Sequence, residues 1–150
     1  LVRSLIKMDI EVLNNHIHSF EKTLGAELLT PTRIYVKTVL ELVKKYNIKG
    51  IAHITGGGFY ENIPRILPSG LTAKIDLGSF EKLPVFDMLT AEAKIDIKEA
   101  YSTFNMGIGM VIAADKRSAK NVLEKAIELG EKAFIIGEVI KGDEGVVLCD

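Results

Sequence analysis

The sequence predicts an α+β or α/β domain in which helices pack on a mixed sheet. Short apolar runs of strand length alternate with amphipathic helical patterns along the chain. The run Gly107–Ala114 is almost wholly apolar, as expected of a central strand buried on both faces. Two strand-like segments near the end of the chain are separated only by the turn-forming residues 141–144. This final hairpin disfavours a purely doubly wound sheet.

The first helix with clear start signals is predicted to begin at Thr30-Pro31. Thr is a good N-cap, and Pro suits the first helical position. Asn47 and Gly50 end the helical pattern, and Ile51–Ile54 follows as a strand. The apolar face of this helix consists of Tyr35, Val39, Leu42, Val43 and Tyr46.

Three consecutive glycines, Gly56–Gly58, follow the apolar run 50–54 and precede a predicted short helix over residues 59–67. Glycine permits positive φ and close approach to a ligand, and a helix N-terminus adds free N–H donors. The pattern indicates a phosphate site, although a strand-to-helix turn can need glycine for geometry alone. His53 and Arg65, on either side of the loop, favour function. A lone His in a strand is nevertheless more often a packed core residue.

The middle of the chain is predicted to hold two further elements. Leu71–Leu77 alternates as a strand, with Ala73, Ile75 and Leu77 on one side. A short helix begins at Pro84 and runs to about residue 92.

The last third of the chain continues the alternation. Asp115 is predicted to cap a helix that Gly130 ends. Ala133–Ile140 and Gly145–Leu148 are then predicted as the two strands of the final hairpin. The core stripe of the helix consists of Ala119, Val122, Leu123, Ala126 and Leu129.

A second candidate for function is the loop Thr103–Gly107, which leads directly into the most apolar strand. Asn105 can both donate and accept hydrogen bonds, although an Asn before a strand is equally typical of a simple turn. Glu138, beside Gly137 in an apolar strand, is a third candidate. A carboxylate on an edge strand that faces water is the simpler interpretation of Glu138.

Composition excludes several classes of function. The formal net charge is −1, and no basic cluster interleaves with aromatic residues, so nucleic-acid binding is not favoured. No apolar run approaches the roughly 18 residues that span a membrane. The single cysteine, Cys149, can form no intrachain disulfide, so nothing requires an oxidising compartment and the cytoplasm is the simplest expectation.

The patterns of several known sites are missing from the sequence. Zinc-type Cys and His spacing, a Walker lysine after the glycines and a serine nucleophile elbow are all absent. The acidic residues are scattered, so no metal site is predicted. The chain therefore lacks a complete catalytic set of its own.

Several runs of residues together resemble one enzyme family. They are Leu28–Lys37, Ala52–Phe59, Glu61–Arg65, Thr103–Met110 and Ile136–Val139. In this order they are similar to the C-terminal half of aminoimidazole ribonucleotide synthetase, or phosphoribosylformylglycinamidine cyclo-ligase, a family of purine biosynthesis. The resemblance extends over nearly the whole chain.

The resemblance implies a three-layer α/β/α sandwich of the α+β class, with a mixed sheet partly like the ferredoxin fold. It also implies a first domain, absent from this chain, that supplies much of the ATP and Mg²⁺ site and the homodimer contact. Leu1–Ile6 looks like the interior of a helix without an N-cap. We therefore expect residues 1–150 to be a C-terminal substrate-binding domain excised from a longer protein, and inactive alone.

The implied reaction is an ATP-dependent ring closure. The formyl oxygen of formylglycinamidine ribonucleotide is phosphorylated, an amidine nitrogen then attacks, and phosphate leaves as aminoimidazole ribonucleotide forms. Positioning and charge stabilisation supply most of the catalysis in phosphoryl transfer.

The resemblance also implies roles for residues of this chain. His53 and Asn105 are expected to be catalytic and to face the substrate or the developing iminophosphate. Family members commonly carry Arg before the Thr-Phe-Asn run, where this chain has Ser102, so a cation beside Asn105 is missing. The two arginines of the binding set are its weaker members, with a structural role as the alternative. The expected substrate- and phosphate-binding residues are Thr55, Gly56, Gly57, Gly58, Asn62, Gly107, Arg33 and Arg65.

Two alternatives stay open at this point. A stand-alone regulatory domain that binds a phosphorylated metabolite would use the same glycine loop. The other alternative is a different ATP-dependent enzyme of the same superfamily, such as formylglycinamidine ribonucleotide synthetase, selenophosphate synthetase or thiamine monophosphate kinase. The run Thr103–Gly107 argues against that second group.

Overall fold

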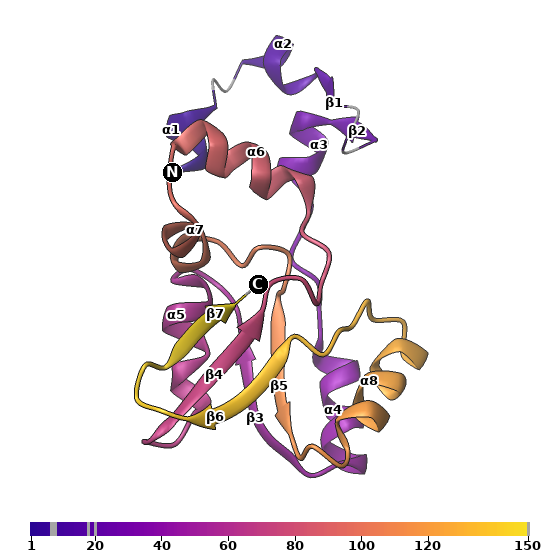
Figure 1. Cartoon of the computed structure of the whole chain (residues 1–150). Coiled ribbons are helices and arrows are strands. Elements are labelled where there is room, and N and C mark those ends of the chain that lie inside the picture. Colours follow the sequence, from indigo (N-terminus) through magenta and orange to yellow (C-terminus); the bar gives the residue numbers. More distant parts are fainter. Residues whose placement is uncertain (7–8, 18, 20, 150) are drawn as a thin grey trace.

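The computed structural model describes residues 1–6, 9–17, 19 and 21–149. Helices and short strands alternate along this part of the chain (Figure 1). The elements, in chain order, are α1 (Val2–Leu5), α2 (Ile10–Leu13), β1 (His16–Ile17), β2 (Lys22–Thr23), α3 (Leu24–Leu28), α4 (Val36–Lys45), β3 (Ile48–His53), α5 (Gly58–Asn62), the 3₁₀ helix η2 (Pro64–Ile66), β4 (Leu71–Asp76), α6 (Pro84–Ala93), α7 (Ile97–Thr103), β5 (Met110–Ala114), α8 (Ala119–Glu128), β6 (Gly137–Lys141) and β7 (Val146–Cys149).

Helices cover both faces of the antiparallel pair β3 and β5. On one face, Leu42 of α4 packs with Val122 and Ala126 of α8. On the other face, the main core includes Phe59 of α5 and Tyr101 of α7. Because side chains alternate across a strand, each strand of the pair supplies residues to both clusters. The arrangement is helix, sheet, helix, in agreement with the expected three layers.

A second sheet has the strand order β6, β4, β7. β6 runs antiparallel to β4 and β7 runs parallel to it, so this sheet is mixed and the predicted α+β class is confirmed. The predicted hairpin between the last two strands is wrong, because β6 and β7 flank β4 instead of pairing with each other. The connection wraps around the start of β4. The Gly142 amide donates to the Gly70 carbonyl at 3.0 Å, and the Glu144 amide donates to the Thr72 hydroxyl at 3.1 Å.

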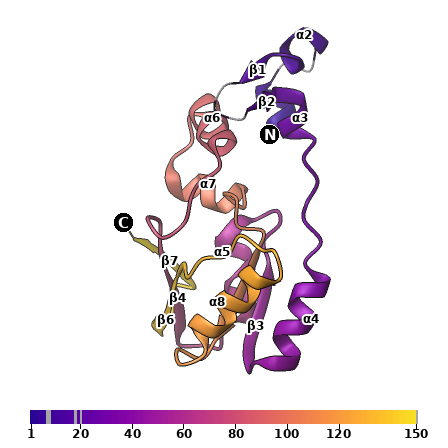
Figure 2. The same ribbon diagram turned by 90° about the vertical axis from the view of Figure 1, so that its right-hand side faces the viewer.

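The N-terminal region up to α3 packs against α6 at one end of the molecule (Figure 1). Its small core contains Ile6, Leu24, Val85 and Leu89. From α3, residues 29–35 run as an extended segment to α4 at the other end (Figure 2).

The predicted helix start at Thr30-Pro31 is wrong, because Thr30 completes the preceding helix instead. Its amide donates to the Glu27 carbonyl at 3.0 Å, and its hydroxyl donates to the Ala26 carbonyl at 3.1 Å. Pro31 then follows the end of a helix, which is another common position for proline. Helix α4 begins only after Tyr35.

The predicted apolar face of α4 is also only partly buried. Leu42 is fully buried, whereas Val43 is 49% exposed. Helix α8 covers a narrow stripe of α4 centred on Leu42, and Val43 lies outside it. Thr38, a polar residue, is buried in that stripe and donates to the Glu131 carboxylate at 2.7 Å.

The predicted central strand differs most from the structure. β5 starts at Met110, and among the described residues it pairs only with β3. Its residues are half-buried, and its other edge pairs with none of the described strands. Gly107 has φ of +93° and belongs to the turn before the strand.

The predicted cap of α8 is displaced by three residues. Ser118 is the N-cap, and its side chain makes no capping hydrogen bond. The Asp115 carboxylate pairs instead with Lys49 at 3.4 Å, while the Asp115 carbonyl accepts from the Ser118 amide at 2.8 Å. Gly130 ends the helix with φ of +88°, as predicted.

Other predictions are confirmed. β3, β4 and α6 lie where the sequence places them, with small shifts at their ends. The helix predicted over residues 59–67 is present as two pieces, α5 and η2, because Pro64 interrupts it. Glu138 is exposed on the edge strand β6. Helix α7, which Asp96 caps by accepting from the Glu99 amide at 2.8 Å, was not predicted.

Candidate functional site

Two loops meet at one end of the pair β3 and β5. We name residues 54–58, which follow β3, the glycine loop, and residues 104–109, which precede β5, the asparagine loop. Antiparallel pairing of His53 with Met110 brings the two loops to the same edge. The Ile54 amide donates to the Gly109 carbonyl at 2.9 Å. The structure therefore joins two candidates that lie about 50 residues apart in the sequence.

The loops touch so closely that Gly58 has no room for a side chain. Its φ is +52°, and a β-carbon would fall on the Tyr101 carbonyl oxygen and 2.7 Å from the Phe104 carbonyl oxygen. Gly57, with φ of +86°, also has a conformation that favours glycine. Gly56 differs from both, because it has no positive φ and, apart from Thr55 and Gly57 on either side, no described residue comes within 4 Å of its would-be β-carbon.

Asn62 lies beneath the glycine loop and is only 4% exposed. Its amide nitrogen donates to the carbonyls of Gly58 at 2.8 Å and Gly56 at 3.2 Å, and approaches that of Thr55 at 3.5 Å. Arg65 donates to the Asn62 side-chain oxygen at 3.1 Å. The structure thus places both predicted binding residues where they support the loop from behind.

His53 is exposed at the end of β3. The Tyr35 ring meets it edge to face, with ring centroids 6.1 Å apart. Tyr35 also covers Gly109, where a β-carbon would collide with its hydroxyl. Burial raises the pKa of Tyr35, the Glu131 carboxylate raises it further, and Arg33 opposes these effects. Sequence reasoning placed Tyr35 on a helix face and missed its position beside His53.

Asn105 is half-buried in the asparagine loop. Its side-chain oxygen accepts from the Gly107 amide at 3.0 Å, and its carbonyl accepts from the Ile108 amide at 2.9 Å. No described residue accepts a hydrogen bond from the Asn105 side-chain nitrogen, so this donor is available to solvent or to a ligand. Ser102, where the resemblance leads us to expect Arg, donates to the Lys98 carbonyl at 2.8 Å within α7.

Arg33 is engaged away from the two loops. Its guanidinium donates to the Gly130 carbonyl at 2.6 Å and pairs with the Glu131 carboxylate at 2.8 Å. These contacts tie the extended segment before α4 to the end of α8. Arg33 lines a cavity that Gly107 also lines, but its hydrogen bond and ion pair are made to the end of α8 and not to the glycine loop.

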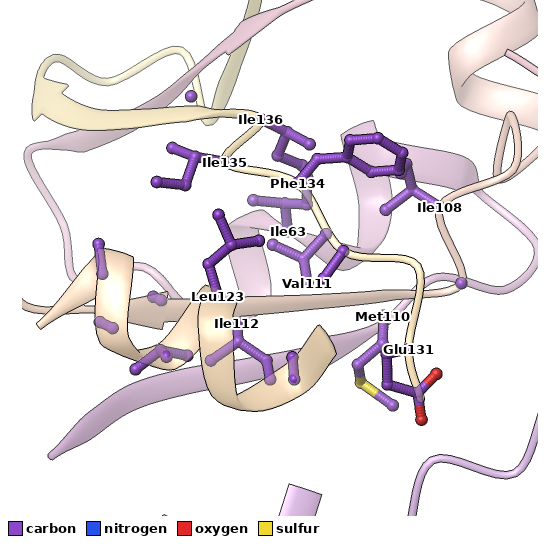
Figure 3. A pocket seen from close by; sticks show the side chains of 18 of the residues that line it. Ile63, Ile108, Met110, Val111, Ile112, Leu123, Glu131, Phe134, Ile135 and Ile136 are labelled. Atoms are coloured by element: carbon purple, nitrogen blue, oxygen red, sulfur yellow. The ribbon is translucent and has the colours of Figure 1, made fainter. Parts of the chain in front are cut away.

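A cavity of about 400 Å³ borders the asparagine loop, and mostly apolar side chains from β5, α8 and the segment before β6 line it (Figure 3). The carboxylate of Glu131 lies at one end, near Met110. Such a lining does not suit a phosphorylated, charged ligand. The two loops are the better candidate for that ligand. The labelled apolar lining residues are Ile63, Ile108, Met110, Val111, Ile112, Leu123, Phe134, Ile135 and Ile136.

Tyr101 of α7 lies directly under the site and escaped the sequence analysis. It is fully buried and packs edge to face on Phe59, with ring centroids 5.1 Å apart. Its hydroxyl has no hydrogen-bond partner among the described residues. Burial, with a smaller contribution from Asp87, raises the pKa of Tyr101 to about 12. A helical tyrosine gives no sequence signal for this position.

The described residues contain no group of three or more His, Cys, Asp or Glu side chains that could hold a metal ion. Within the same residues, no helix is both long enough and apolar enough to cross a membrane.

Comparisons with known proteins agree with the resemblance found in the sequence. A phosphoribosylformylglycinamidine cyclo-ligase of Acetivibrio thermocellus is 50% identical over 149 residues, which cover 99% of this chain and 44% of that protein. Another, of Bacillus cytotoxicus, is 52% identical over 143 residues, which cover 95% of this chain and 41% of that protein. The chain therefore spans less than half the length of these curated relatives.

The fold also matches a solved structure. E. coli HypE, a hydrogenase maturation protein, superposes with a TM-score of 0.63 over 83% of this chain and 40% of that chain, at 23% identity. At this identity the likeness shows the fold alone. A family model described as "AIR synthase related protein, C-terminal domain" matches residues 4–150. The chain therefore belongs to the family of AIR synthase related proteins and comprises their C-terminal domain.

Proposed function

We propose that the chain is the substrate-binding half of an ATP-dependent cyclo-ligase that converts formylglycinamidine ribonucleotide to aminoimidazole ribonucleotide. The names of the relatives that match almost the whole chain support this reaction. In the proposed reaction, the formyl oxygen attacks the γ-phosphorus of ATP and ADP leaves. An amidine nitrogen then attacks the formyl carbon, the carbon–oxygen bond breaks, and phosphate is released.

The observation that carries the proposal is the junction of the two loops. The glycine loop and the asparagine loop are hydrogen-bonded to each other and end on the same edge of one sheet. Geometry explains glycine at Gly57 and Gly58, but it does not explain Gly56, which is exposed and has open space around it. A ligand that approaches the backbone there would explain the third glycine.

The residues around the junction then have separate tasks. The backbone amides of the glycine loop, with the Thr55 hydroxyl, bind a phosphate of the substrate. His53 and the free donor of Asn105 face the reacting amide, where they stabilise the charge that develops on oxygen. Gly107 allows the sharp turn that presents Asn105. Arg33 and Arg65 are supporting residues in this proposal, because both are engaged with this chain's own groups.

ATP and Mg²⁺ belong mainly to another part of the enzyme in this proposal. The described residues gather no metal-ligand set, so we assign no residue of this chain to Mg²⁺. We propose that the remaining half of the full-length protein holds the nucleotide and forms a homodimer. We also propose a cytoplasmic enzyme that acts on a small molecule and binds neither nucleic acid nor membrane.

The test is turnover by the full-length gene product. With ATP, Mg²⁺ and formylglycinamidine ribonucleotide, we expect one ADP and one phosphate for each aminoimidazole ribonucleotide formed, measured by coupled ADP assay and mass spectrometry. The 150-residue chain alone, as the matched control, should form no product. Binding of the ribonucleotide without any turnover by the full-length protein would favour a phosphometabolite-binding regulatory domain. ATP consumption only with a different substrate would favour another enzyme of the superfamily.

A further inference from the structure

Among the described residues, only the Asn62 side chain donates hydrogen bonds to the backbone carbonyls of the glycine loop. Its amide nitrogen has two N–H groups. It donates to the Gly58 carbonyl at 2.8 Å and to the Gly56 carbonyl at 3.2 Å, and it lies 3.5 Å from the Thr55 carbonyl. At 4% exposure, water cannot replace these bonds. This buried carboxamide therefore helps to hold the glycine loop, together with the backbone hydrogen bond from the Gly58 amide to the Thr55 carbonyl at 3.1 Å.

Arg65 fixes which way this carboxamide is turned. Its guanidinium donates to the Asn62 oxygen at 3.1 Å and lies 3.6 Å from the Glu61 carboxylate. A flipped Asn62 would set its NH₂ against the guanidinium and its oxygen against the loop carbonyls, both repulsive. The orientation with the nitrogen toward the loop is therefore the favoured one.

Holding the carbonyls inward sets the direction of the loop amides. The peptide bonds of the glycine loop, like all those in the described residues, are trans, and in a trans peptide the C=O and the following N–H point in opposite directions. Because the Thr55 and Gly56 carbonyls face Asn62, the Gly56 and Gly57 amides face away from it. Neither amide donates a backbone hydrogen bond among the described residues.

We propose that Asn62 is a positioning residue that orients the Gly56 and Gly57 amides toward the phosphate of the substrate, with Arg65 locking its carboxamide in place. Asn62 does not touch the substrate itself. The identity of the ligand rests on the function proposed above, whereas the orientation of the amides does not. This role differs from the substrate or phosphate binding expected of Asn62 from the family resemblance.

The test is Asn62→Asp in the full-length gene product, because the change keeps the size of the side chain and removes its donors. We expect the KM for formylglycinamidine ribonucleotide to rise about tenfold or more, with kcat changed less than about threefold. This pattern is expected because the phosphate contact is lost equally from the bound substrate and from the transition state. Asn47→Asp, at an exposed position, makes the same chemical change and should leave both constants unaltered.

A readout without ligand separates this role from a purely structural one. In ¹⁵N-glycine-labelled protein, Asn62→Asp should move the Gly56 and Gly57 amide resonances and leave those of Gly130 and Gly142 in place. Arg65→Met, which keeps the donors, should move the same two resonances by less and also covers the case in which Asn62→Asp does not fold. Unmoved Gly56 and Gly57 resonances in Arg65→Met, or in a folded Asn62→Asp variant, would overturn the proposal. Absence of cyclo-ligase turnover in the wild type would instead count against the proposed function.

Discussion

Gly58 lies against Tyr101 so closely that a β-carbon at position 58 would fall on the Tyr101 carbonyl oxygen. This contact joins the glycine loop to the end of α7, from which the asparagine loop continues. The geometry of one loop therefore depends on the position of the other.

Gly58→Ala should destabilise the protein by about 2 kcal/mol or more. The new methyl group meets two backbone carbonyls that cannot rotate away, and φ of +52° is strained for alanine. Chemical denaturation of wild type and variant measures the difference in the free energy of unfolding. Equal midpoints and slopes would show that the two loops are not in contact as described.

Gly56→Ala is the matched comparison, because the same methyl group enters open space at a residue without positive φ. We expect the free energy of unfolding to stay within about 0.5 kcal/mol, or to rise slightly as the unfolded chain loses freedom. The KM for the phosphorylated substrate should increase about tenfold, because the methyl group obstructs the approach to the loop amides. A normal KM would mean that the ligand does not approach Gly56.

His53→Ala should lower kcat/KM about 10²- to 10⁴-fold if the imidazole acts on the reacting amide. The fold should persist, since His53 is exposed and its one described ring contact is with Tyr35. Steady-state kinetics and circular dichroism on the full-length protein measure both effects. His16→Ala, in β1 of the N-terminal region, is the control. Undiminished activity of the His53 variant would exclude the proposed role.

Stability should fall above pH 10 because of Tyr101. Its pKa is raised to about 12 in the folded protein, against about 10 in the unfolded chain, so the unfolded state loses the proton first. Stability is therefore complete below pH 10 and declines by about 1.4 kcal/mol for each pH unit between about 10 and 12.

Tyr101→Phe should reduce this decline. At pH 7 the variant should match or exceed the stability of the wild type, because the hydroxyl it removes is buried without a described partner. Urea denaturation from pH 7 to pH 11.5 gives both comparisons. A wild type and a variant with identical pH slopes would show that Tyr101 is not the group that titrates.

Local signals in the sequence were sufficient for much of the fold. β3 follows from its short apolar run, β4 from alternation and α6 from Pro84, because these signals come from residues close together in the sequence. The predicted helix start at Thr30 is wrong because the Thr30 hydroxyl and amide donate hydrogen bonds to carbonyls of the preceding helix. Threonine suits either position, so the residue type alone does not distinguish a helix start from a helix end. The predicted hairpin is wrong because the connection between β6 and β7 is hydrogen-bonded to Gly70 and Thr72, which lie some 70 residues earlier in the sequence.

The candidate site shows the same division between local and distant causes. Gly56–Gly58 and Asn105 were found from their types and spacing. The closeness of Gly58 to Tyr101 and of Tyr35 to His53 could not be predicted, since each contact joins elements that are distant in sequence. Asn62 was found by resemblance, but its position beneath the loop required coordinates.

The joint site is tested most directly by asking whether the two loops bind one ligand together. Formylglycinamidine ribonucleotide can be titrated into the ¹⁵N-glycine-labelled full-length gene product while the glycine amide resonances are followed. We expect the Gly56, Gly57, Gly107 and Gly109 resonances to shift with a single dissociation constant, while those of Gly130 and Gly142 stay in place. Shifts confined to one loop, or to glycines outside both, would contradict the joint site.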